Sequence, residues 1–548
     1  MTTRILAAIL ISIHVAHGAW VPPIGIPVPP FGLTNTHWIY TNAGKTYDFG
    51  TGAVAYPTTA DGPYTHWVDN EHPSATDTAN TYGSPTTPRL TFEENLAPGS
   101  VVVIKGTNYD FNNGSTRCTL GGPGTEAAPQ FYRGLSTNAR PSFVGRDMTF
   151  WGSYCVFENL AISNFTMNVR ADLWTNTCHH LVIRGCEVEG SGATDNGSCI
   201  GFTTSANRIQ YFLVISNIIH DFGDWDSGTE NDMHGVHPDV AGQDYCWIVD
   251  NEIWHMGGDS VQIGSATGPS DSTYTYVGRN LFWDNNENAI DVKLTSHVVI
   301  SENKMWGFKT TASSAGEAVV IHNNPTNCWT IFNVISNATI GMISTGAGTD
   351  CYWLGNFVLN CAVGGEMRGG GTNYWLGNTF VGVTNAIENS GASDADNPIL
   401  SNIIYGLTNA TGHHIFYDNT SLAAASSMHN NLLYQTNGGD VRIRWGATTY
   451  TSLSAFQSAT SKGASSLQSD PLFVANGGYP LLVTSPAIGA GTNLSTWTSL
   501  YATMFGETIT VDIAGSPISV PRDMGAWEYQ YGLTNSNPKI RGIRLRMN

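Results

Sequence analysis

Two stretches of the sequence, Tyr352-Trp-Leu-Gly-Asn356-Phe-Val and Tyr374-Trp-Leu-Gly-Asn378-Thr-Phe, repeat one pattern 22 residues apart. In both, an apolar strand leads to an Asn, and a second apolar pair follows. The same pattern surrounds further asparagines, namely Asn217, Asn251, Asn280, Asn303, Asn333 and Asn402. Successive asparagines are 34, 29, 23, 30, 23, 22 and 24 residues apart, so the short intervals fit one bare coil and the long ones carry inserted loops. Self-similarity at this period predicts a stacked repeat architecture.

The repeated segments have the composition of β-strands, because apolar residues alternate and β-branched and aromatic types dominate. One coil cannot close a core alone and must stack on its neighbours. We therefore expect an all-β fold, a right-handed parallel β-helix. At the bend between two strands, Asn tolerates left-handed backbone angles, and its amide can hydrogen-bond the Asn of the next coil. The asparagines should form one ladder along the solenoid.

The pattern divides the chain into five parts. Residues 1–18 are expected to be a signal peptide and residues 19–97 a lead-in and N-terminal cap. Residues 98–434 should form the parallel β-helix, residues 435–530 its closing segment, and residues 531–548 a basic tail.

The first residues have the features of a secretory signal. Arg4 precedes a short apolar run, Ile5–Ile13, and small residues follow at Ala16 and Gly18. The run is too short for a bilayer, which takes roughly 20 residues. We expect cleavage near Gly18 and a secreted protein, extracellular or periplasmic, with an uncut N-terminal anchor as the alternative. No other segment is long and apolar enough to predict a membrane span.

The composition of the chain limits which kinds of molecule it is expected to bind. The net charge is −19, from 24 basic and 43 acidic residues, which argues against nucleic acid because phosphate binding needs a basic footprint. A local basic cluster could still bind an acidic polymer. The nine cysteines include no Cys-x-x-Cys pair, so a zinc site of that kind is not expected. Their odd number leaves at least one thiol free, and most should occupy small apolar positions inside the solenoid.

Both ends of the repeat region carry motifs with a family resemblance. The N-terminal side reads Trp67-Val-Asp-Asn-Glu-His-Pro and Ala97-Pro-Gly-Ser-Val-Val-Val-Ile. The C-terminal side reads Ser469-Asp-Pro-Leu-Phe, Ser485-Pro-Ala-Ile-Gly-Ala-Gly and Asp523-Met-Gly-Ala-Trp-Glu-Tyr529. With the coils, these segments resemble secreted bacterial pectate-lyase-like β-helix proteins over most of the mature chain. The resemblance implies the fold, and it implies extracellular polysaccharide lyases, some glycoside hydrolases and many inert members.

Four consecutive coils align at a second strand: His234–Asp239, Asp259–Gly264, Asn288–Lys293 and Glu317–His322. The third and fifth positions are apolar and should point inward, since strand side chains alternate. The fourth and sixth positions should then face solvent. The outward set is His237, Gln262, Asp291, Asp239, Lys293 and His322, with Arg368 two coils further on. Coils about 4.8 Å apart would spread this set along a groove about 25 Å long.

This set fits the chemistry of a uronate lyase, which needs a base for the proton beside the carboxylate and a cation that neutralises the carboxylate. Lys293 is the expected base, and Asp-x-Lys on an outward strand resembles lysine-base polysaccharide lyases, where acidic residues hold calcium. The full assignment is catalytic Lys293, His322 and Arg368, substrate-binding His237, Gln262 and Trp225, and Ca²⁺-binding Asp239, Asp259 and Asp291. Glu230 and Glu287 are further oxygen donors nearby in sequence.

Other interpretations remain open. Asp291 and Lys293 could form a plain surface ion pair, which contributes roughly 0–1 kcal/mol. A glycoside hydrolase with paired carboxylates is a second possibility, since Gly257–Gly264 resembles the aspartate-bearing strand of polygalacturonases. The doubled aspartate and the Arg-x-Lys motif of those enzymes are absent from this sequence. A non-catalytic, carbohydrate-binding or adhesive solenoid is the third, and it predicts only scattered polar residues.

Overall fold

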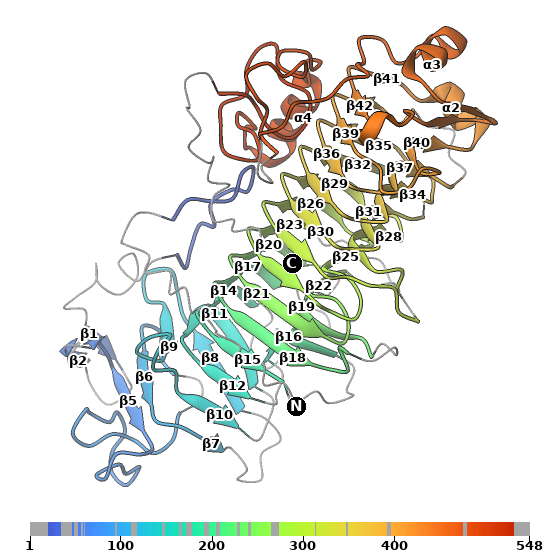
Figure 1. Cartoon of the computed structure of the whole chain (residues 1–548). Coiled ribbons are helices and arrows are strands. Elements are labelled where there is room, and N and C mark those ends of the chain that lie inside the picture. Colours follow the sequence, from blue (N-terminus) through green and yellow to red (C-terminus); the bar gives the residue numbers. More distant parts are fainter. Residues whose placement is uncertain are drawn as a thin grey trace.

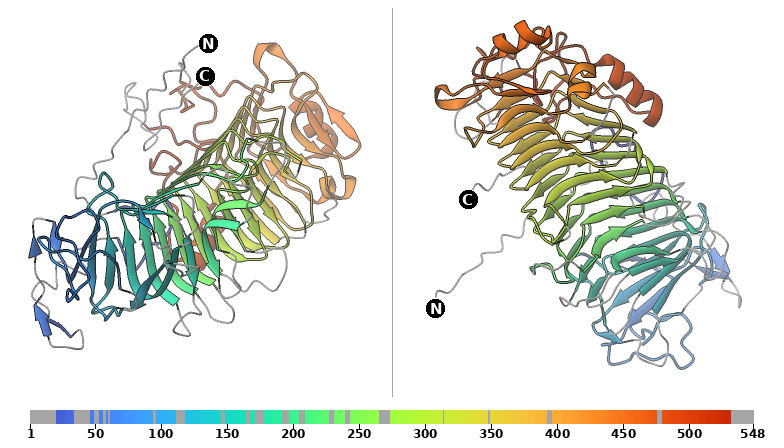
Figure 2. Two further views of the ribbon diagram at one scale, coloured as in Figure 1. Left: turned by 90° about the horizontal axis from the view of Figure 1, so that it is seen from below. Right: turned by 90° about the vertical axis from the view of Figure 1, so that its right-hand side faces the viewer.

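The computed structural model describes residues 20–33, 46–48, 53–55, 58–59, 61–93 and 96–530. Within the last range it leaves out residues 111–117, 145–147, 164–166, 171–177, 191–196, 204–208, 227–230, 239–242, 265–272, 313, 347–348, 392–395 and 475–478. The described chain is an elongated stack of coils whose strands run parallel to those of the neighbouring coils (Figures 1 and 2). The predicted right-handed parallel β-helix is confirmed.

Each coil contributes one strand to each of three parallel sheets. Sheet I consists of β11 (Met148–Glu158), β14 (Cys178–Arg184), β17 (Ile209–Ile215), β20 (Gln243–Val249), β23 (Thr273–Gly278), β26 (Ser296–Ser301), β29 (Thr326–Ile331), β32 (Thr349–Leu354), β35 (Asn373–Leu376), β38 (Ile399–Leu400) and β41 (Met428–His429).

Sheet II has 13 strands and follows sheet I in each coil. Its strands are β7 (Tyr109–Asp110), β10 (Ser142–Val144), β12 (Ala161–Ser163), β15 (Glu187–Glu189), β18 (Ile218–Phe222), β21 (Glu252–Met256), β24 (Leu281–Trp283), β27 (Lys304–Trp306), β30 (Val334–Ser336), β33 (Phe357–Leu359), β36 (Thr379–Val381), β39 (Ile403–Tyr405) and β42 (Leu432–Tyr434).

Sheet III completes the coil and carries the strands aligned in the sequence. It consists of β13 (Met167–Arg170), β16 (Gly197–Thr203), β19 (Met233–His237), β22 (Val261–Ile263), β25 (Ile290–Lys293), β28 (Glu317–His322), β31 (Ile340–Ser344), β34 (Val363–Met367), β37 (Asn385–Asn389), β40 (His413–Tyr417) and β43 (Ile443–Trp445). The register sets Ile290 beside Val261 and Val319, as the sequence alignment predicts.

The inward side chains form one continuous apolar core through the solenoid. Burying apolar area contributes about 25 cal/mol per Å², so the stacked coils stabilise one another. Eight cysteines lie buried with free thiols, as the sequence predicts for small apolar positions: Cys155, Cys178, Cys186, Cys199, Cys246, Cys328, Cys351 and Cys361.

The Asn ladder runs along the bend between sheets I and II. The amide Nδ2 of each Asn donates to Oδ1 of the Asn one coil on, at 2.9–3.1 Å, from Asn217 to Asn431. Each Oδ1 also accepts the backbone N–H of the preceding Asn, for example from Asn280 to Asn303 at 3.0 Å. All of these asparagines are buried, so the ladder satisfies polar groups that water cannot reach.

The expected backbone role of the Asn is wrong in one respect. The left-handed residue is the one before the Asn: Gly355 has φ +63° and Gly377 has φ +61°. In other coils the same position is occupied by non-glycine residues with φ of 53–60°, namely Ser216, Asp250, Arg279, Glu302, Phe332 and Ser401. The bend therefore selects Asn for its amide, and the preceding residue adopts the left-handed conformation.

The N-terminal side of the stack begins with β5 (His66–Asp69), which pairs in parallel with β6 (Val101–Lys105). The first full coils follow through β9 (Gln130–Arg133) and β8 (Cys118–Pro123). Two short antiparallel pairs precede them: β1 (Thr46–Asp48) with β2 (Ala53–Ala55), and β3 (Thr58–Thr59) with β4 (Gly62–Pro63).

The far end carries the helices α2 (Thr420–Ala425), α3 (Leu453–Thr460) and α4 (Ser495–Phe505), with η2 (Thr436–Gly438) and β44 (Thr448–Tyr450) (Figure 1). Asn419 caps α2 and Ser452 caps α3 through side-chain oxygens. Among the described residues, no helix combines the length and hydropathy that a membrane crossing requires.

The outer face of sheet I is covered by both terminal segments. Residues 20–33 lie along it: Trp20 donates to Asp250 at 2.8 Å, and Trp247 donates to the carbonyl of Pro27 at 2.9 Å. Tyr501 of α4 packs on Trp329 and donates to the carbonyl of Gly25 at 2.6 Å. This packing leaves the outer faces of sheets II and III to carry the candidate sites.

Candidate active site

The polar face is defined here as the outer side of β19, β22, β25 and β28 in sheet III. Strand register aligns His237, Gln262, Asp291 and Val320 in one column across these strands, and Lys293 and His322 in the next. Ile290 and Val292 point into the core and are fully buried. The alternation inferred from the sequence is correct from the third position of these four strands onward, for the residues that the structure describes.

Lys293 lies at the centre of this face. Its Nζ is 2.9 Å from Asp291 Oδ2 and donates to Gln262 Oε1 at 2.6 Å. Burial pulls the pKa of Lys293 down, but the charges of Asp291 and Asp259 outweigh it and raise the pKa overall. The side chain keeps 16% of its surface exposed, enough to meet a molecule on this face.

Asp291 differs from the expectation that it faces solvent. It is on the outer side of β25 but only 3% exposed, because Lys293, Gln262 and His322 surround it. Burial and the nearby charge of Asp259 raise the pKa of Asp291 to about 7. The Asp291–Lys293 pair is therefore more enclosed than a surface ion pair, and burial favours the protonated form of Asp291.

Two histidines flank the pair in neutral form. Burial and the charge of Lys293 lower the pKa of His322 to about 4, and burial lowers that of His237 to about 3. His322 Nε2 lies 3.5 Å from Asp291 Oδ1, and neither atom has a hydrogen-bond partner in the described structure. His237 Nε2 lies 2.7 Å from Gln262 Nε2. A proton shared between Asp291 and His322 would satisfy both atoms.

A second polar column adjoins the first, at the start of the same strands. It contains His234, Asp259, Asn288 and Glu317. The ring of His234 is 5.0 Å from that of His237, so the two columns touch. The sequence prediction includes only Asp259 from this column. The other three residues could have been found from the sequence, because the first position of all four aligned strands is polar.

Asp259 is completely buried and strongly held. Asn288 donates to its Oδ1 from both the side-chain amide, at 2.8 Å, and the backbone N–H, at 3.2 Å. Its Oδ2 lies 3.3 Å from His234 Nδ1 but makes no hydrogen bond to the described residues. Burial alone would raise the pKa of Asp259, whereas His234, Lys293 and Asn288 lower it overall.

The residues of this face fit a divalent cation. Asp259 Oδ2 and Asp291 Oδ1 are buried carboxylate oxygens without hydrogen-bond partners in the described structure, and each needs a positive neighbour. Ligand atoms of His234, Asp259 and Glu287 lie within 4.8 Å of one another. Carboxylate oxygens suit Ca²⁺, and one imidazole beside them also suits Zn²⁺. Asp239, the third residue expected to bind Ca²⁺, and Glu230 lie outside the described residues.

Arg368 and Trp225 lie away from Lys293. Arg368 is two coils beyond His322, about 10 Å by the coil spacing, and forms an ion pair with Glu366 at 2.6 Å. Val320 and Ile343 form an apolar patch between Asp291 and Glu366. Trp225 stacks on His255, with ring centroids 3.5 Å apart, and His255 belongs to sheet II. Neither residue contacts the Lys293–Asp291 pair directly.

Comparison with known proteins gives similarity in fold alone. No protein-family model matches the chain, and no curated protein matches its sequence. Pectate lyase Pel9A is 13% identical over 88% of this chain and 99% of that chain, with a TM-score of 0.41. An alginate lyase from Paenibacillus sp. str. FPU-7 is 14% identical over 50% of this chain and 87% of that chain, with a TM-score of 0.33.

A third solved structure is a mannuronic acid-specific polysaccharide family 6 lyase from human gut microbiota. It is 13% identical over 62% of this chain and 82% of that chain, with a TM-score of 0.38. At these identities and scores the matches carry no information on activity. The chemistry of this chain is therefore argued from its own residues.

Proposed function

We propose that the protein is a secreted polysaccharide lyase that cleaves a uronate-containing polymer by β-elimination. The observation that carries the proposal is the placement of Lys293 on the outer face of sheet III, between Asp291 and Gln262 and beside neutral His322. A base, a proton-holding pair and neutral hydrogen-bonding groups are thereby collected on neighbouring coils. Stacked parallel strands also present them along a line, which suits a linear polymer.

In the proposed reaction, Lys293 Nζ takes the proton from the carbon beside the uronate carboxylate. The electron pair of that C–H bond forms a double bond to the adjacent carbon, whose bond to the glycosidic oxygen breaks. The departing oxygen acquires a proton and becomes a free hydroxyl. In the proposal, the protonated form of the Asp291–His322 pair on the same face would be the donor, since burial raises the pKa of Asp291 and His322 Nε2 lies 3.5 Å from its Oδ1.

Lys293 must be neutral to accept a proton, but the negative charges of Asp291 and Asp259 raise its pKa and favour its charged form. A divalent cation such as Ca²⁺, held by Asp259 and Glu287 with His234 beside them, would supply positive charge for the substrate carboxylate, and Asp291 is a further proposed oxygen ligand. Gln262 and His237 would contact the sugar hydroxyls, because both present polar groups beside Lys293. Secretion follows in this proposal from the signal sequence over residues 1–18.

A panel of acidic and neutral polysaccharides tests the proposal. Each polymer is incubated with the full chain, with and without added Ca²⁺, and scored for unsaturated-uronate absorbance and for reducing ends. A lyase produces absorbance together with new ends on at least one uronate polymer. The absence of absorbance on every uronate polymer, with or without Ca²⁺, contradicts the proposal.

One observation favours a glycoside hydrolase as the second candidate. The pKa of Asp291 is raised to about 7 while that of Asp259 is lowered, and an acid and base separated in this way are typical of paired catalytic carboxylates. Against it, Asp259 has no exposed surface and cannot reach a sugar without rearrangement. New reducing ends without absorbance would support the hydrolase. Binding without either product would leave a carbohydrate-binding solenoid.

A further inference from the structure

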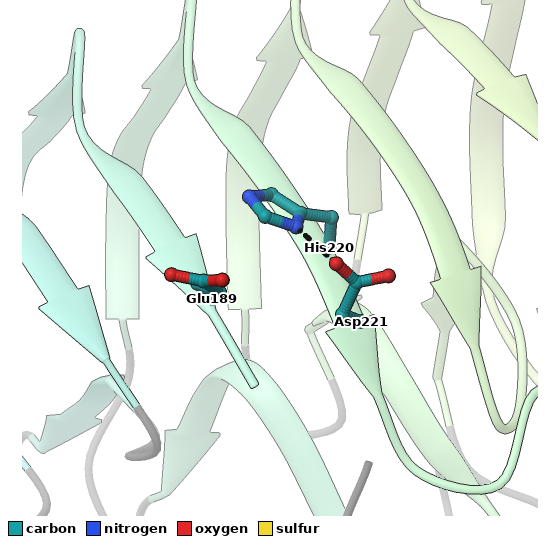
Figure 3. A group of neighbouring side chains, drawn as sticks. All are labelled: Glu189, His220 and Asp221. Atoms are coloured by element: carbon teal, nitrogen blue, oxygen red, sulfur yellow. Dashed lines mark hydrogen bonds and ion pairs between the residues drawn. The ribbon is translucent and has the colours of Figure 1, made fainter. Parts of the chain in front are cut away.

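A second cluster of ligand-type side chains lies on the outer face of sheet II. Glu189 on β15 and His220 on β18 are direct neighbours in the strand register, and Asp221 follows His220 (Figure 3). One ligand atom from each of the three lies within 4.8 Å of the other two. This cluster takes no part in the proposed polysaccharide chemistry and lies on a different sheet.

His220 is fixed in position by its surroundings. Its ring stacks on Trp254, with centroids 4.6 Å apart and planes 3° from parallel. Its Nε2 faces Glu187 Oε1 at 3.7 Å, and Arg140 binds Oε2 of the same carboxylate at 2.8 Å. A metal-binding histidine typically directs its second ring nitrogen at a carboxylate in this way, which leaves the first nitrogen for the ion. That first nitrogen, Nδ1, is 2.8 Å from Asp221 Oδ2.

The carboxylate of Asp221 is oriented by a contact at Oδ1, the oxygen that does not face His220. His255 Nδ1 lies 2.6 Å from Asp221 Oδ1, and Trp225 stacks on the ring of His255. The backbone of Asp221 is left-handed, with φ +61°, which turns the carboxylate back toward β18. Glu189 is exposed and makes no hydrogen bond or ion pair with the described residues. Two ligands are thus held in place, and the third can move to close the site.

We infer that Glu189, His220 and Asp221 bind a first-row divalent transition metal ion, for which Zn²⁺ is the probe. Imidazole with carboxylates and no thiolate is the ligand class of Zn²⁺, Cu²⁺ and Ni²⁺, whereas Ca²⁺ prefers oxygen alone. Ligand atoms about 2.1 Å from an ion lie roughly 3–4 Å from each other, so an ion would replace the 2.8 Å His220–Asp221 hydrogen bond, move those two atoms slightly apart and draw in the exposed Glu189 side chain. Two carboxylates and neutral His220 balance the charge of a divalent ion.

Such an ion would connect the coils to a loop. Asp221 lies next to the last residue of β18, and the chain continues from there through Asp224. The carbonyl of Asp224 accepts a hydrogen bond from Asn286 Nδ2 at 3.0 Å. That loop leads to β19, which carries His234 and His237. Metal at this cluster would therefore link β15 and β18 to the segment that precedes the polar face.

Protons compete with the ion for this site. Burial lowers the pKa of His220, but the carboxylates of Glu187, Asp221 and Glu189 outweigh it and raise the pKa overall. His220 must lose its proton to bind metal, so affinity should fall as the pH decreases through that raised pKa. Among the described residues, His255 contacts Asp221 and Arg140 contacts Glu187, and both are retained in the variants below.

Zn²⁺ titration of the full chain by calorimetry at pH 7.5 tests the inference, with Glu189→Gln and Asp221→Asn as isosteric variants. The matched control is Asp284→Asn. Asp284 directly follows β24 and occupies the register position that Asp221 has on β18, with a similar φ of +51°, but it follows Trp283 instead of a histidine. Glu287→Gln identifies any Zn²⁺ held at the polar face instead.

The wild type and Asp284→Asn should bind one equivalent that both ligand variants lose or bind at least about tenfold more weakly. The Cu²⁺-loaded wild type should also show the hyperfine signature of a single imidazole nitrogen in electron paramagnetic resonance. Circular dichroism and melting temperature verify that the variants are folded. Absence of a Zn²⁺ equivalent in the wild type, or its retention in Asp221→Asn, overturns the inference and leaves His220 as a protonated partner of the carboxylates.

Discussion

On the outer faces of both sheet II and sheet III, side chains of successive coils align in columns. The two faces differ in what the side chains of a column contact. On sheet II, one column contains His220, Trp254, Trp283 and Trp306, and successive ring centroids are 4.6–5.1 Å apart with planes within 8° of parallel. Each ring covers the face of the next. On sheet III, the equivalent columns change residue type at every coil and leave buried carboxylate oxygens without partners in the described structure.

This difference separates structure from function in a solenoid. A column of identical or similar side chains repeats one favourable contact at each coil, as the Asn ladder and the Trp stack do. A column of unlike polar side chains cannot repeat a contact, so its groups remain available to a ligand. Buried groups without partners carry an energetic cost, and Asp259, Asp291 and His322 on the polar face are among the described residues that bear it.

The largest effect should come from the centre of the polar face. Lys293→Ala should reduce elimination on the order of 10³-fold, because loss of a general base typically costs 10²–10⁴-fold. Lys293→Arg should restore little, since a guanidinium hardly deprotonates near neutral pH. The measurement is the initial rate of unsaturated-uronate formation on a polymer that the wild type cleaves.

Lys304→Ala is the control for this experiment, because Lys304 lies on the outer side of sheet II. Lys304→Ala should leave the rate unchanged and melt close to the wild type. Lys293→Ala removes the partner of the buried Asp291 carboxylate and should lower the melting temperature, so circular dichroism at the assay temperature verifies that it is folded. If Lys293→Ala retains wild-type activity, the polar face loses its proposed base and the carboxylates of Asp259 and Asp291 become the candidates.

The second effect concerns the ladder. Asn303→Ala should lower the free energy of unfolding by about 3 kcal/mol, because several buried backbone and amide groups lose their partners at once. Asn303 is fully buried, and its Nδ2 donates to Asn333 Oδ1 at 3.0 Å and to the carbonyl of Val277 at 2.9 Å. Urea unfolding followed by circular dichroism measures the change. A loss below about 1 kcal/mol would mean that the ladder is not a main stabilising contact.

The ladder and the core were predictable from the sequence because both repeat. One Asn per coil at a constant phase identifies the bend, and apolar Ile290 and Val292 identify the inward side of β25. The second polar column, which contains Asn288, does not follow the same rule. Ala289 and Ile290 both belong to the core, so strict alternation does not hold at the start of β25. Asn288 therefore adjoins the outer face although alternation would turn it inward.

Contacts between distant parts of the chain also could not be predicted from the sequence. Nothing in the Pro- and Gly-rich residues 20–33 indicates that they lie along sheet I and meet α4 through Gly25 and Tyr501. The burial of Asp291 is likewise a tertiary property, since it depends on Lys293, Gln262 and His322 from three strands. Residue types predict which polar groups lie on this face, and only the folded chain shows which of their atoms lack partners among the described residues.

A moderate effect should appear in the pH dependence of the lyase reaction. Asp291 raises the pKa of Lys293, so removing its charge with Asp291→Asn should lower that pKa. Because the base acts when deprotonated, the rise of kcat/KM with pH should move to lower pH by about one unit. Added Ca²⁺ should move the wild-type profile in the same direction. An unchanged profile in Asp291→Asn would show that the titration of Lys293 does not limit the reaction.

The smallest effect should come from the Trp column, and it decides whether that column is structural. Trp283 is half-buried between Trp254 and Trp306, at centroid distances of 4.6 and 5.1 Å, so neither face of its ring is open to a sugar. Trp283→Ala should lower stability by about 1–2 kcal/mol, the contribution of one or two aromatic pairs, and leave polymer binding and kcat/KM unchanged. Trp225→Ala is the informative partner, because Trp225 is predicted to contact substrate and its one ring contact among the described residues is with His255. Affinity electrophoresis in a gel that contains the polymer compares both variants with the wild type. If the polymer retards Trp283→Ala less than the wild type but retards Trp225→Ala normally, the Trp column of sheet II binds the polymer. The distinction between columns whose side chains contact one another and columns that bind a ligand would then be wrong.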